Sequence, residues 1–565
     1  MERFFKHGVR KEERSVAYFS MEIGLEEGMR TYSGGLGVLA GDNVKSSADL
    51  HVPMVAVTLL HEKGYFRQKL NEKGEQEELP EQWDKTDKLK HMKVNVKIGM
   101  EGRKVKVTAW EHNVVGARGY EVPVLFLDTN VEGNAAYDKT LTSHLYGGDE
   151  KYRLCQEAVL GIGGVRALNA LGFRGIKKYH MNEGHASLLT LELFRELNYT
   201  ENPKEEVHRR CVFTTHTPVA AGHDEFSLDL VKEVLTEHPL EKEILGDAIK
   251  DGKLNMTRLG LHFSEFINGV AKKHGEVSRE LFPGYVIEYI TNGVHSGTWV
   301  SEPFKKLFDR NISGWLQDPF SLRYAMGIPN EEIWEAHVLA KKDLINYVNK
   351  EANGEMDEES FTIGFARRAT AYKRAQLLFQ DVERLNGIAE KQGNIQIIYS
   401  GKSHPKDVHG KEIIKKIFEL KKNLGKKVRF CYLENYDMSV AKKMVAGCDL
   451  WLNTPVRPME ASGTSGMKAA HNGVPSLSVL DGWWIEGCIE NVTGWSIGPK
   501  GTIPKDQDEE DARDLYNKLE YVIMPLFYNE RNRWTEIMKH TIAINASFFN
   551  THRMVSQYVL NAYFA

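Results

Sequence analysis

Short apolar runs alternate with helical stretches along most of the chain, and this alternation limits the fold more than any other feature of the sequence. The apolar runs are mostly continuous, as expected for strands that are buried on both faces of a parallel sheet. Between many of them, the chain is long enough for the helices that connect parallel strands. Candidate strands lie at residues 16–20, 54–60, 94–98, 105–110, 120–127, 177–182, 211–215, 286–291, 361–365, 395–399, 428–432, 450–452 and 476–480.

This pattern predicts an α/β protein with two doubly wound, Rossmann-like domains that face a central cleft. A chain of 565 residues is long enough for two or more domains. We place the boundary near residue 290. Residues 1–290 then form an N-terminal α/β domain with a β-hairpin insertion at 94–110. Residues 291–565 form a C-terminal α/β domain, whose last helix could cross back to the first domain.

The composition of the chain excludes several classes of protein. Its 74 lysine and arginine residues and 78 aspartate and glutamate residues give a net charge of −4, which argues against nucleic-acid binding through a basic face. No apolar run approaches the roughly 20 residues that span a bilayer, and residues 1–15 do not resemble a signal peptide. The five cysteines form no CxxC pair, which argues against a disulfide scaffold. We therefore expect a cytoplasmic protein that binds neither nucleic acid nor membrane.

Polar and basic residues lie after several of the candidate strands. In open parallel sheets, ligands bind at the carboxyl ends of the strands, so these residues are candidates for a binding site. The segments concerned are 33–37, 182–185, 214–218, 291–295, 366–374 and 460–468.

Two of these segments suggest an anion site. The glycines of segment 34–37 would let backbone N–H groups approach a phosphate at a helix N-terminus, although the same segment could equally be a tight turn. Arg367, Arg368, Lys373 and Arg374 place four cations within eight residues, directly after a buried strand. This position favours an anion site over a solvated face.

The residues alone leave two roles open for Lys468, which follows a Ser-Gly-Thr-Ser-Gly loop. It could contact a bound phosphate, or it could form a Schiff base with pyridoxal phosphate, whose phosphate group the loop would cradle. The loop does not match the Walker pattern, because a methionine separates its last glycine from the lysine. Glu460, at the start of the same segment, could bind sugar hydroxyls or serve as a structural carboxylate.

A metal site is a weaker interpretation of the histidines. His180, Glu183 and His185 lie within six residues, but no third or fourth ligand has a convincing spacing. We therefore predict no metal site.

At these motifs the sequence resembles the α-glucan phosphorylases, the family of glycogen, starch and maltodextrin phosphorylases. The Glu-Ala-Ser-Gly-Thr-Ser-Gly-Met-Lys stretch at 460–468 is similar to the family's pyridoxal-phosphate lysine motif, and segment 368–374 is similar to its substrate-phosphate segment. Segments 434–436, 291–293 with Trp299, and 34–37 match in the family's order. The resemblance runs from about residue 16 to the helices after Trp484, and it implies a two-domain fold of the glycosyltransferase GT-B type.

The resemblance implies pyridoxal 5′-phosphate as the cofactor. Lys468 would carry it as a Schiff base, while Arg367 and the backbone of Thr464 and Ser465 would hold its phosphate group. Gly35 would help to bind phosphate through its N–H. The residues implied at the cofactor are Lys468, Arg367, Thr464, Ser465, Tyr436 and Gly35.

The resemblance also assigns residues to the substrates. Arg368 and Lys373 would hold the attacking inorganic phosphate, and the backbone carbonyl of His216 would face the anomeric carbon. The first domain would form the glucan side of the cleft. The residues implied to bind substrate are Glu460, Asn292, Tyr372, Ser462, Gly463 and Gly34.

The implied activity is phosphorolysis of terminal α-1,4-linked glucosyl units to glucose 1-phosphate with retained configuration, with the cofactor's phosphate group as the acid. The implied partners are the glucan, inorganic phosphate and glucose 1-phosphate, and a homo-oligomer is compatible with the family. Two other interpretations stay open. One is a nucleotide-sugar-dependent glucan synthase of the same fold, and the other is a non-catalytic glucan-binding protein.

The sequence departs from the family pattern at several positions. The chain begins almost at the catalytic core, so we expect no counterpart of the N-terminal regulatory region of the larger enzymes. Thr370, His295 and Thr298 differ from the family's residues, and Glu183 replaces an aspartate. These differences bear on acceptor preference and effector control more than on the core chemistry.

Overall fold

The computed structural model describes residues 10–219, 222–352, 354–499, 501, 503 and 505–564. Its internal contacts divide the chain into two compact units. Unit 1 contains the chain up to Phe66, Pro80–Thr291 and the residues from Met554 onward, and unit 2 contains Arg67–Leu79 and Asn292–Arg553. Segment 67–79 therefore belongs to the other unit than the predicted range 1–290 implies, whereas residues 554–564 belong to unit 1, as they would if the last helix crosses back.

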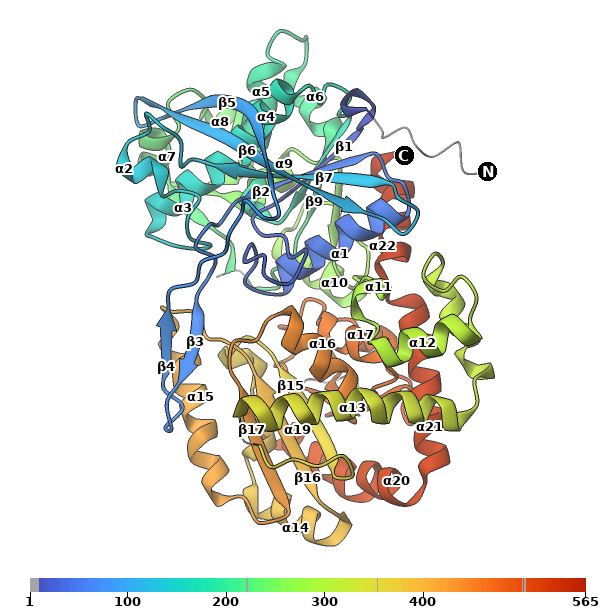
Figure 1. Cartoon of the computed structure of the whole chain (residues 1–565). Coiled ribbons are helices and arrows are strands. Elements are labelled where there is room, and N and C mark those ends of the chain that lie inside the picture. The colour runs from blue at the N-terminus through green and yellow to red at the C-terminus, as the bar shows by residue number, and fades with distance from the viewer. Residues whose placement is uncertain are drawn as a thin grey trace. The chain divides into compact units, whose positions relative to one another are not determined.

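Unit 1 is built on a nine-stranded sheet (Figure 1). The seven strands from β14 to β7 pair in parallel, and β7, β6 and β5 pair antiparallel. The expected hairpin insertion is the pair β5–β6, which extends the main sheet because β6 bonds to β7. In sheet order the strands are β14 (Glu288–Tyr289), β13 (Phe266–Gly269), β9 (Cys211–Thr214), β8 (Lys178–Asn182), β1 (Val16–Ser20), β2 (Met54–Leu59), β7 (Glu121–Asp128), β6 (Arg103–Val115) and β5 (Lys90–Met100).

The strand order of unit 1 has a switch point between β1 and β8. From β1 the chain adds β2 and β7 on one side, and later adds β8, β9, β13 and β14 on the other. Every residue of β1 and β2 is buried, as their continuous apolar sequences predict. Ligands of doubly wound sheets bind outside the carboxyl ends of the strands at such a point. Residues just after β1 and β8 are therefore the candidates in this unit.

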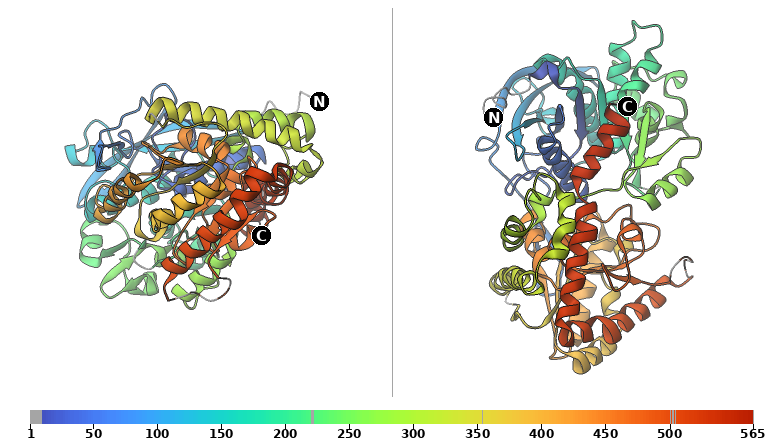
Figure 2. Two further views of the ribbon diagram at one scale, coloured as in Figure 1. Left: turned by 90° about the horizontal axis from the view of Figure 1, so that it is seen from below. Right: turned by 90° about the vertical axis from the view of Figure 1, so that its right-hand side faces the viewer.

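The end of the chain completes unit 1. Helix α22 (Thr551–Tyr558) is the last α-helix, and Figure 2 shows this terminal part of the chain in red. Tyr558 lies against Thr214 with 3.1 Å between their hydroxyl oxygens, and the Tyr563 hydroxyl lies 2.7 Å from His180 Nδ1. These buried contacts hold the last residues on strands β8 and β9.

Unit 2 is built on six parallel strands. From β15 the chain adds β16 and β17 on one side and later adds β18, β19 and β20 on the other, so the switch point lies between β15 and β18. Helices α13 (Asn330–Ala352) and α16 (Met438–Gly447) pack against each other in this unit. In sheet order the strands are β17 (Val428–Leu433), β16 (Ile395–Ser400), β15 (Phe361–Ala366), β18 (Leu450–Asn453), β19 (Ser476–Val479) and β20 (Gly494–Ile497).

Unit 2 also contains a small hairpin that the sequence pattern does not indicate. Strands β3 (Arg67–Leu70) and β4 (Gln76–Leu79) pair antiparallel, and both are labelled in Figure 1. Their residues are mostly charged or polar, so they carry no apolar run. The predicted class, an α/β protein with two doubly wound sheets, is confirmed by these two topologies. None of the described helices has both the length and the apolar character needed to cross a membrane.

Candidate active-site residues in the two units

The predicted cations of unit 2 separate into different environments. The loop after β15 leads into a single 3₁₀ turn at Ala371–Lys373, so the cations do not share one helix. Arg367 Nη2 and Lys373 Nζ each donate to Glu460 Oε2 at 2.6 Å, and all three side chains are largely buried. Arg368, by contrast, is exposed.

Arg374 belongs to the scaffold and not to an open anion site. Its guanidinium is buried, bonds Asp511 Oδ2 at 2.6 Å and donates to the carbonyl of Thr454 at 2.9 Å. Asp511 lies on α19 (Gln507–Lys518), so Arg374 joins this helix to the loop after β18. The predicted cluster of four cations therefore reduces to Arg367, Arg368 and Lys373.

Two buried carboxyl groups lie beside these cations. Burial opposes charge on Glu460, but Arg367 and Lys373 outweigh it and lower the pKa of Glu460 to about 2. Asp481, two residues past β19, accepts the backbone N–H of Glu460 at 2.8 Å and that of Gly482 at 2.9 Å. Burial nevertheless raises the pKa of Asp481 to about 7. Asp481 was not predicted as a site residue, although its position just after a strand could have indicated it.

Lys468 lies within α17 (Thr464–Ala470) and is buried, with 6% of its surface exposed. Its Nζ lies 3.9 Å from the centroid of the Trp299 ring. Asn472 donates to the carbonyl oxygens of Trp299 at 2.9 Å and of Lys468 at 3.1 Å. Gly463 precedes the helix with a φ of 85°, a left-handed conformation that favours glycine. The loop thus places a buried amine on an aromatic ring.

Two predicted substrate-binding residues in unit 2 present unsatisfied polar atoms. Ser462 Oγ and Asn292 Oδ1 are buried and have no hydrogen-bond partner among the described residues. Buried polar atoms are nearly always bonded, so each of these atoms is available to a bound ligand or to a water molecule. Thr370 is one of the residues that depart from the family pattern, and its Oγ1 is also buried without a hydrogen-bond partner among the described residues.

The remaining predicted residues of unit 2 lie beside these groups in sequence or in space. Thr464 and Ser465 begin α17, and Ser465 Oγ accepts a hydrogen bond from Trp451 Nε1 at 3.1 Å. The Tyr372 ring lies under Lys373 Nζ at 4.3 Å. Burial raises the pKa of Tyr436 well above its usual range, so its hydroxyl stays protonated.

In unit 1, a buried carboxylate holds the glycine loop before helix α1 (Gly35–Asp49). Glu22 Oε2 accepts the backbone N–H groups of Ser33 at 2.5 Å and Gly34 at 3.2 Å, and the Tyr146 hydroxyl donates to its other oxygen at 2.8 Å. The N–H of Gly34 is therefore already hydrogen-bonded within the protein. Gly35, by contrast, is exposed, and no other atom lies near the position that a Cβ would take there. Sequence reasoning missed Glu22, although it follows β1 by two residues.

His216 follows β9 and is fixed by residues that follow β8. Its backbone N–H donates to Glu183 Oε2 at 2.7 Å, and its Nε2 lies 2.6 Å from Asn182 Oδ1. Burial lowers the pKa of the His216 imidazole to about 3, so the ring is neutral near pH 7 and cannot act there as an acid. Asn182 in turn donates to Ser20 Oγ at 3.1 Å at the end of β1. The switch point of unit 1 is thus a connected polar network.

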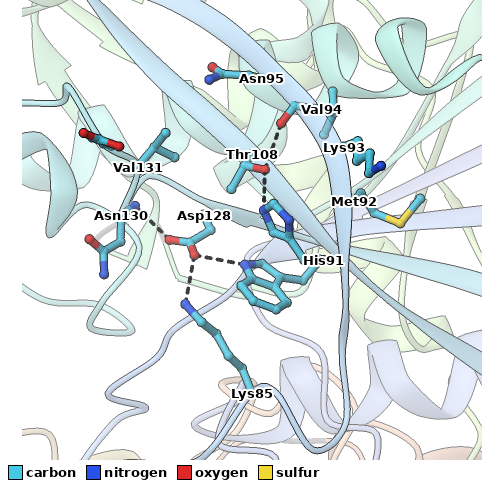
Figure 3. A pocket seen from close by; sticks show the side chains of 12 residues that line it. Lys85, His91, Met92, Lys93, Val94, Asn95, Thr108, Asp128, Asn130 and Val131 are labelled. Atoms are coloured by element: carbon cyan, nitrogen blue, oxygen red, sulfur yellow. Dashed lines mark hydrogen bonds and ion pairs between the residues drawn. The ribbon is translucent and has the colours of Figure 1, made fainter.

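A separate cavity of about 510 Å³ in unit 1 contains none of the predicted residues (Figure 3). Asp128 accepts from Lys85 Nζ at 3.0 Å, Trp110 Nε1 at 3.0 Å and the backbone N–H of Asn130 at 2.8 Å. These polar groups of its wall satisfy one another, as buried structural groups do.

Comparisons with known proteins place these residues in a family context. The family model described as Carbohydrate phosphorylase matches residues 21–149 and 169–497. The chain is 39% identical to the maltodextrin phosphorylase of Thermococcus litoralis, over 98% of this chain and 71% of that protein. It is 34% identical to the glycogen phosphorylase of Aquifex aeolicus, over 97% of this chain and 86% of that protein. It is 30% identical to an uncharacterised protein of Methanocaldococcus jannaschii, over 97% of this chain and 100% of that protein.

Proposed function

Because the chain belongs to the carbohydrate phosphorylase family, we propose that it is an α-1,4-glucan phosphorylase. It would cleave terminal glucosyl units from glycogen, starch or maltodextrin with inorganic phosphate and release glucose 1-phosphate with retained configuration. Two relatives that match 98% and 97% of this chain are named as phosphorylases, which supports this assignment. The observation that carries it is the buried amine of Lys468, close in sequence to the Glu460 carboxylate that binds Arg367 and Lys373.

The donor set of unit 2 fits pyridoxal 5′-phosphate. Lys468 supplies a buried amine for its aldehyde, and Arg367 and the backbone of Thr464 and Ser465 would hold its phosphate group. The unsatisfied Oγ of Ser462, in the same loop, would bind a glucosyl hydroxyl of the substrate. When bound, the cofactor would supply an acid through its phosphate group, whose second pKa of about 6 suits proton transfer near neutral pH.

The protein's own residues would bind and orient the substrates. Arg368 and Lys373 would hold inorganic phosphate, because cations are needed to bring two phosphate groups together. Glu460 gives one oxygen to Arg367 and Lys373, and its second oxygen would accept from a glucosyl hydroxyl. Asn292 Oδ1 would accept from another hydroxyl. Tyr372, Gly463 and Gly34 would complete the substrate contacts.

In unit 1, burial lowers the pKa of the His216 imidazole and favours its neutral form, so we propose a role for the backbone of this residue. We assign its backbone carbonyl to the anomeric carbon and the N–H of Gly35 to phosphate. Bonds from Glu183 and Asn182 would hold His216 in place for this role. We further propose a cytoplasmic enzyme without a metal cofactor that binds no nucleic acid, and we leave its oligomeric state to measurement.

The cofactor assignment has a direct test. Borohydride reduction of the purified enzyme, followed by peptide mass analysis, should place a pyridoxyl group on Lys468 and on no other lysine. A Lys468→Ala variant is the control, because it should carry no adduct. An adduct at another lysine, or none in the wild-type enzyme, would refute the role of Lys468.

A further inference from the structure

The hairpin β3–β4 lies in sequence between two stretches of unit 1, yet its contacts assign it to unit 2. We call residues 67–79 the strap. A two-stranded hairpin alone is marginally stable in water, so contacts with the rest of unit 2 must hold the strap in place. These contacts converge on loops at the carboxyl edge of the unit 2 sheet.

Gln68, in β3, is fully buried and makes the central contacts. Its backbone N–H donates to Asn435 Oδ1 at 2.6 Å, and the backbone N–H of Asn435 donates back to Gln68 Oε1 at 3.2 Å. Its Nε2 donates to the carbonyl of Gly401 at 2.9 Å. Gly401 follows β16 and Asn435 follows β17, so one side chain joins two neighbouring loops.

Other residues of the strap hold the same loops. The Leu70 N–H donates to Glu434 Oε1 at 2.7 Å. The side-chain amide of Gln76 donates to the carbonyl of Ser403 at 3.0 Å and accepts its N–H at 2.9 Å. Leu70 also packs in the small apolar cluster that contains Ala369, in the loop after β15 that carries Arg367. The strap therefore bonds the loops after two adjacent strands and shares an apolar cluster with the loop after a third.

We infer that the strap positions the cofactor loops of unit 2 and that Gln68 is the residue through which it does so. Asn435 directly precedes Tyr436, the residue proposed beside the cofactor, and Asn435 has a φ of 57°. Asparagine adopts the left-handed conformation more readily than most residues, and here Gln68 bonds both its backbone N–H and its side chain. These bonds thereby fix the direction of Tyr436. The inference rests on the proposed function.

The test compares release of pyridoxal phosphate from the wild-type holoenzyme and from two variants, with hydroxylamine present to trap the released aldehyde. Gln68→Met keeps the size of the side chain and removes its amide. Asn435→Gly keeps the left-handed conformation and removes the acceptor of the Gln68 N–H. Lys69→Ala, an exposed change on the same strand, is the matched control.

We expect release to be about tenfold faster in Gln68→Met and Asn435→Gly, because each leaves a buried polar group unpaired. Cofactor fluorescence should change in both variants, and Lys69→Ala should match the wild type. The second variant keeps the test valid if Gln68→Met does not fold. Wild-type release rates and fluorescence in the folded variants, or equal acceleration in Lys69→Ala, would overturn the inference. A wild-type enzyme without pyridoxal phosphate would instead refute the proposed function.

Discussion

Arg368 and Lys373 look equivalent in the sequence, but the structure places them in different environments. Lys373 is 8% exposed and bonds Glu460, whereas Arg368 is exposed. The sequence predicts the charges and their position after a strand, because both follow from residue type and strand order. It does not predict which cation is buried, because that depends on Glu460, which is 87 residues away along the chain.

Because of this difference, substitutions of the two cations should have different effects on stability. We expect Arg368→Ala and Lys373→Ala each to lower kcat/KM for phosphate by about 10- to 150-fold, because each removes a charge-assisted contact. Lys373→Ala should also lower the free energy of unfolding by about 3 kcal/mol, because a buried carboxylate loses one cation partner. Arg368→Ala should lower it less, because Arg368 is exposed. Steady-state kinetics and denaturant unfolding measure the two effects. Wild-type kinetics in both variants would mean that neither cation binds the phosphate substrate.

The raised pKa of Asp481 predicts a pH dependence of stability. The pKa of the Asp481 carboxyl is 3.8 in the unfolded chain and about 7 in the folded protein. A raised carboxyl pKa stabilises the fold at low pH, and this contribution is lost as pH rises from about 4 to about 7. A shift of about three units corresponds to about 4 kcal/mol.

Asp481→Asn removes this titration and keeps a similar shape. The difference in the free energy of unfolding between wild type and variant, measured by urea unfolding across this pH range, should therefore change steadily and level off above about pH 7. A constant difference at every pH would show that Asp481 titrates normally in the folded protein.

At the scale of elements, the long apolar strands were predictable and the polar ones were not. Strands such as β1, β2 and β15 are buried throughout, so a continuous apolar run marks them. Strand β3 has exposed and buried residues in a polar sequence, and its pairing depends on contacts with loops far along the chain. No local pattern encodes those contacts, so the strap could be found only in the structure.

Two glycines make a further test at this scale. Gly463 has a φ of 85° before α17, so Gly463→Ala should lower the free energy of unfolding by about 1–2 kcal/mol through backbone strain. Gly387 lies inside α14 (Val382–Gln392), and an added Cβ would meet open space there. Gly387→Ala should therefore raise the free energy of unfolding by about 0.5–1 kcal/mol. Chemical denaturation of both variants measures these changes. A stabilised Gly463→Ala variant would contradict the left-handed conformation before the lysine helix.

At the scale of the whole molecule, the sequence predicts two doubly wound sheets, and both sheets are present. The chain passes between the units four times, at 66/67, 79/80, 291/292 and 553/554. The sequence suggests a boundary near residue 290 and a last helix that could cross back, but it gives no sign of the first two passages, which flank the strap and its polar strands. Membership of a unit is decided by tertiary contacts, such as those of Tyr558 and Tyr563 with strands β8 and β9.

Phosphorolysis of an α-1,4-glucan is the proposed reaction of this protein, and one assay measures it directly. The purified enzyme is incubated with maltodextrin and inorganic phosphate without any nucleotide, and glucose 1-phosphate and glucose are both quantified. We expect glucose 1-phosphate to accumulate only when phosphate is present, to carry the α configuration, and to exceed free glucose. The Lys468→Ala protein should form none. Absence of glucose 1-phosphate, with release of free glucose in its place or with no turnover at all, would contradict phosphorolysis.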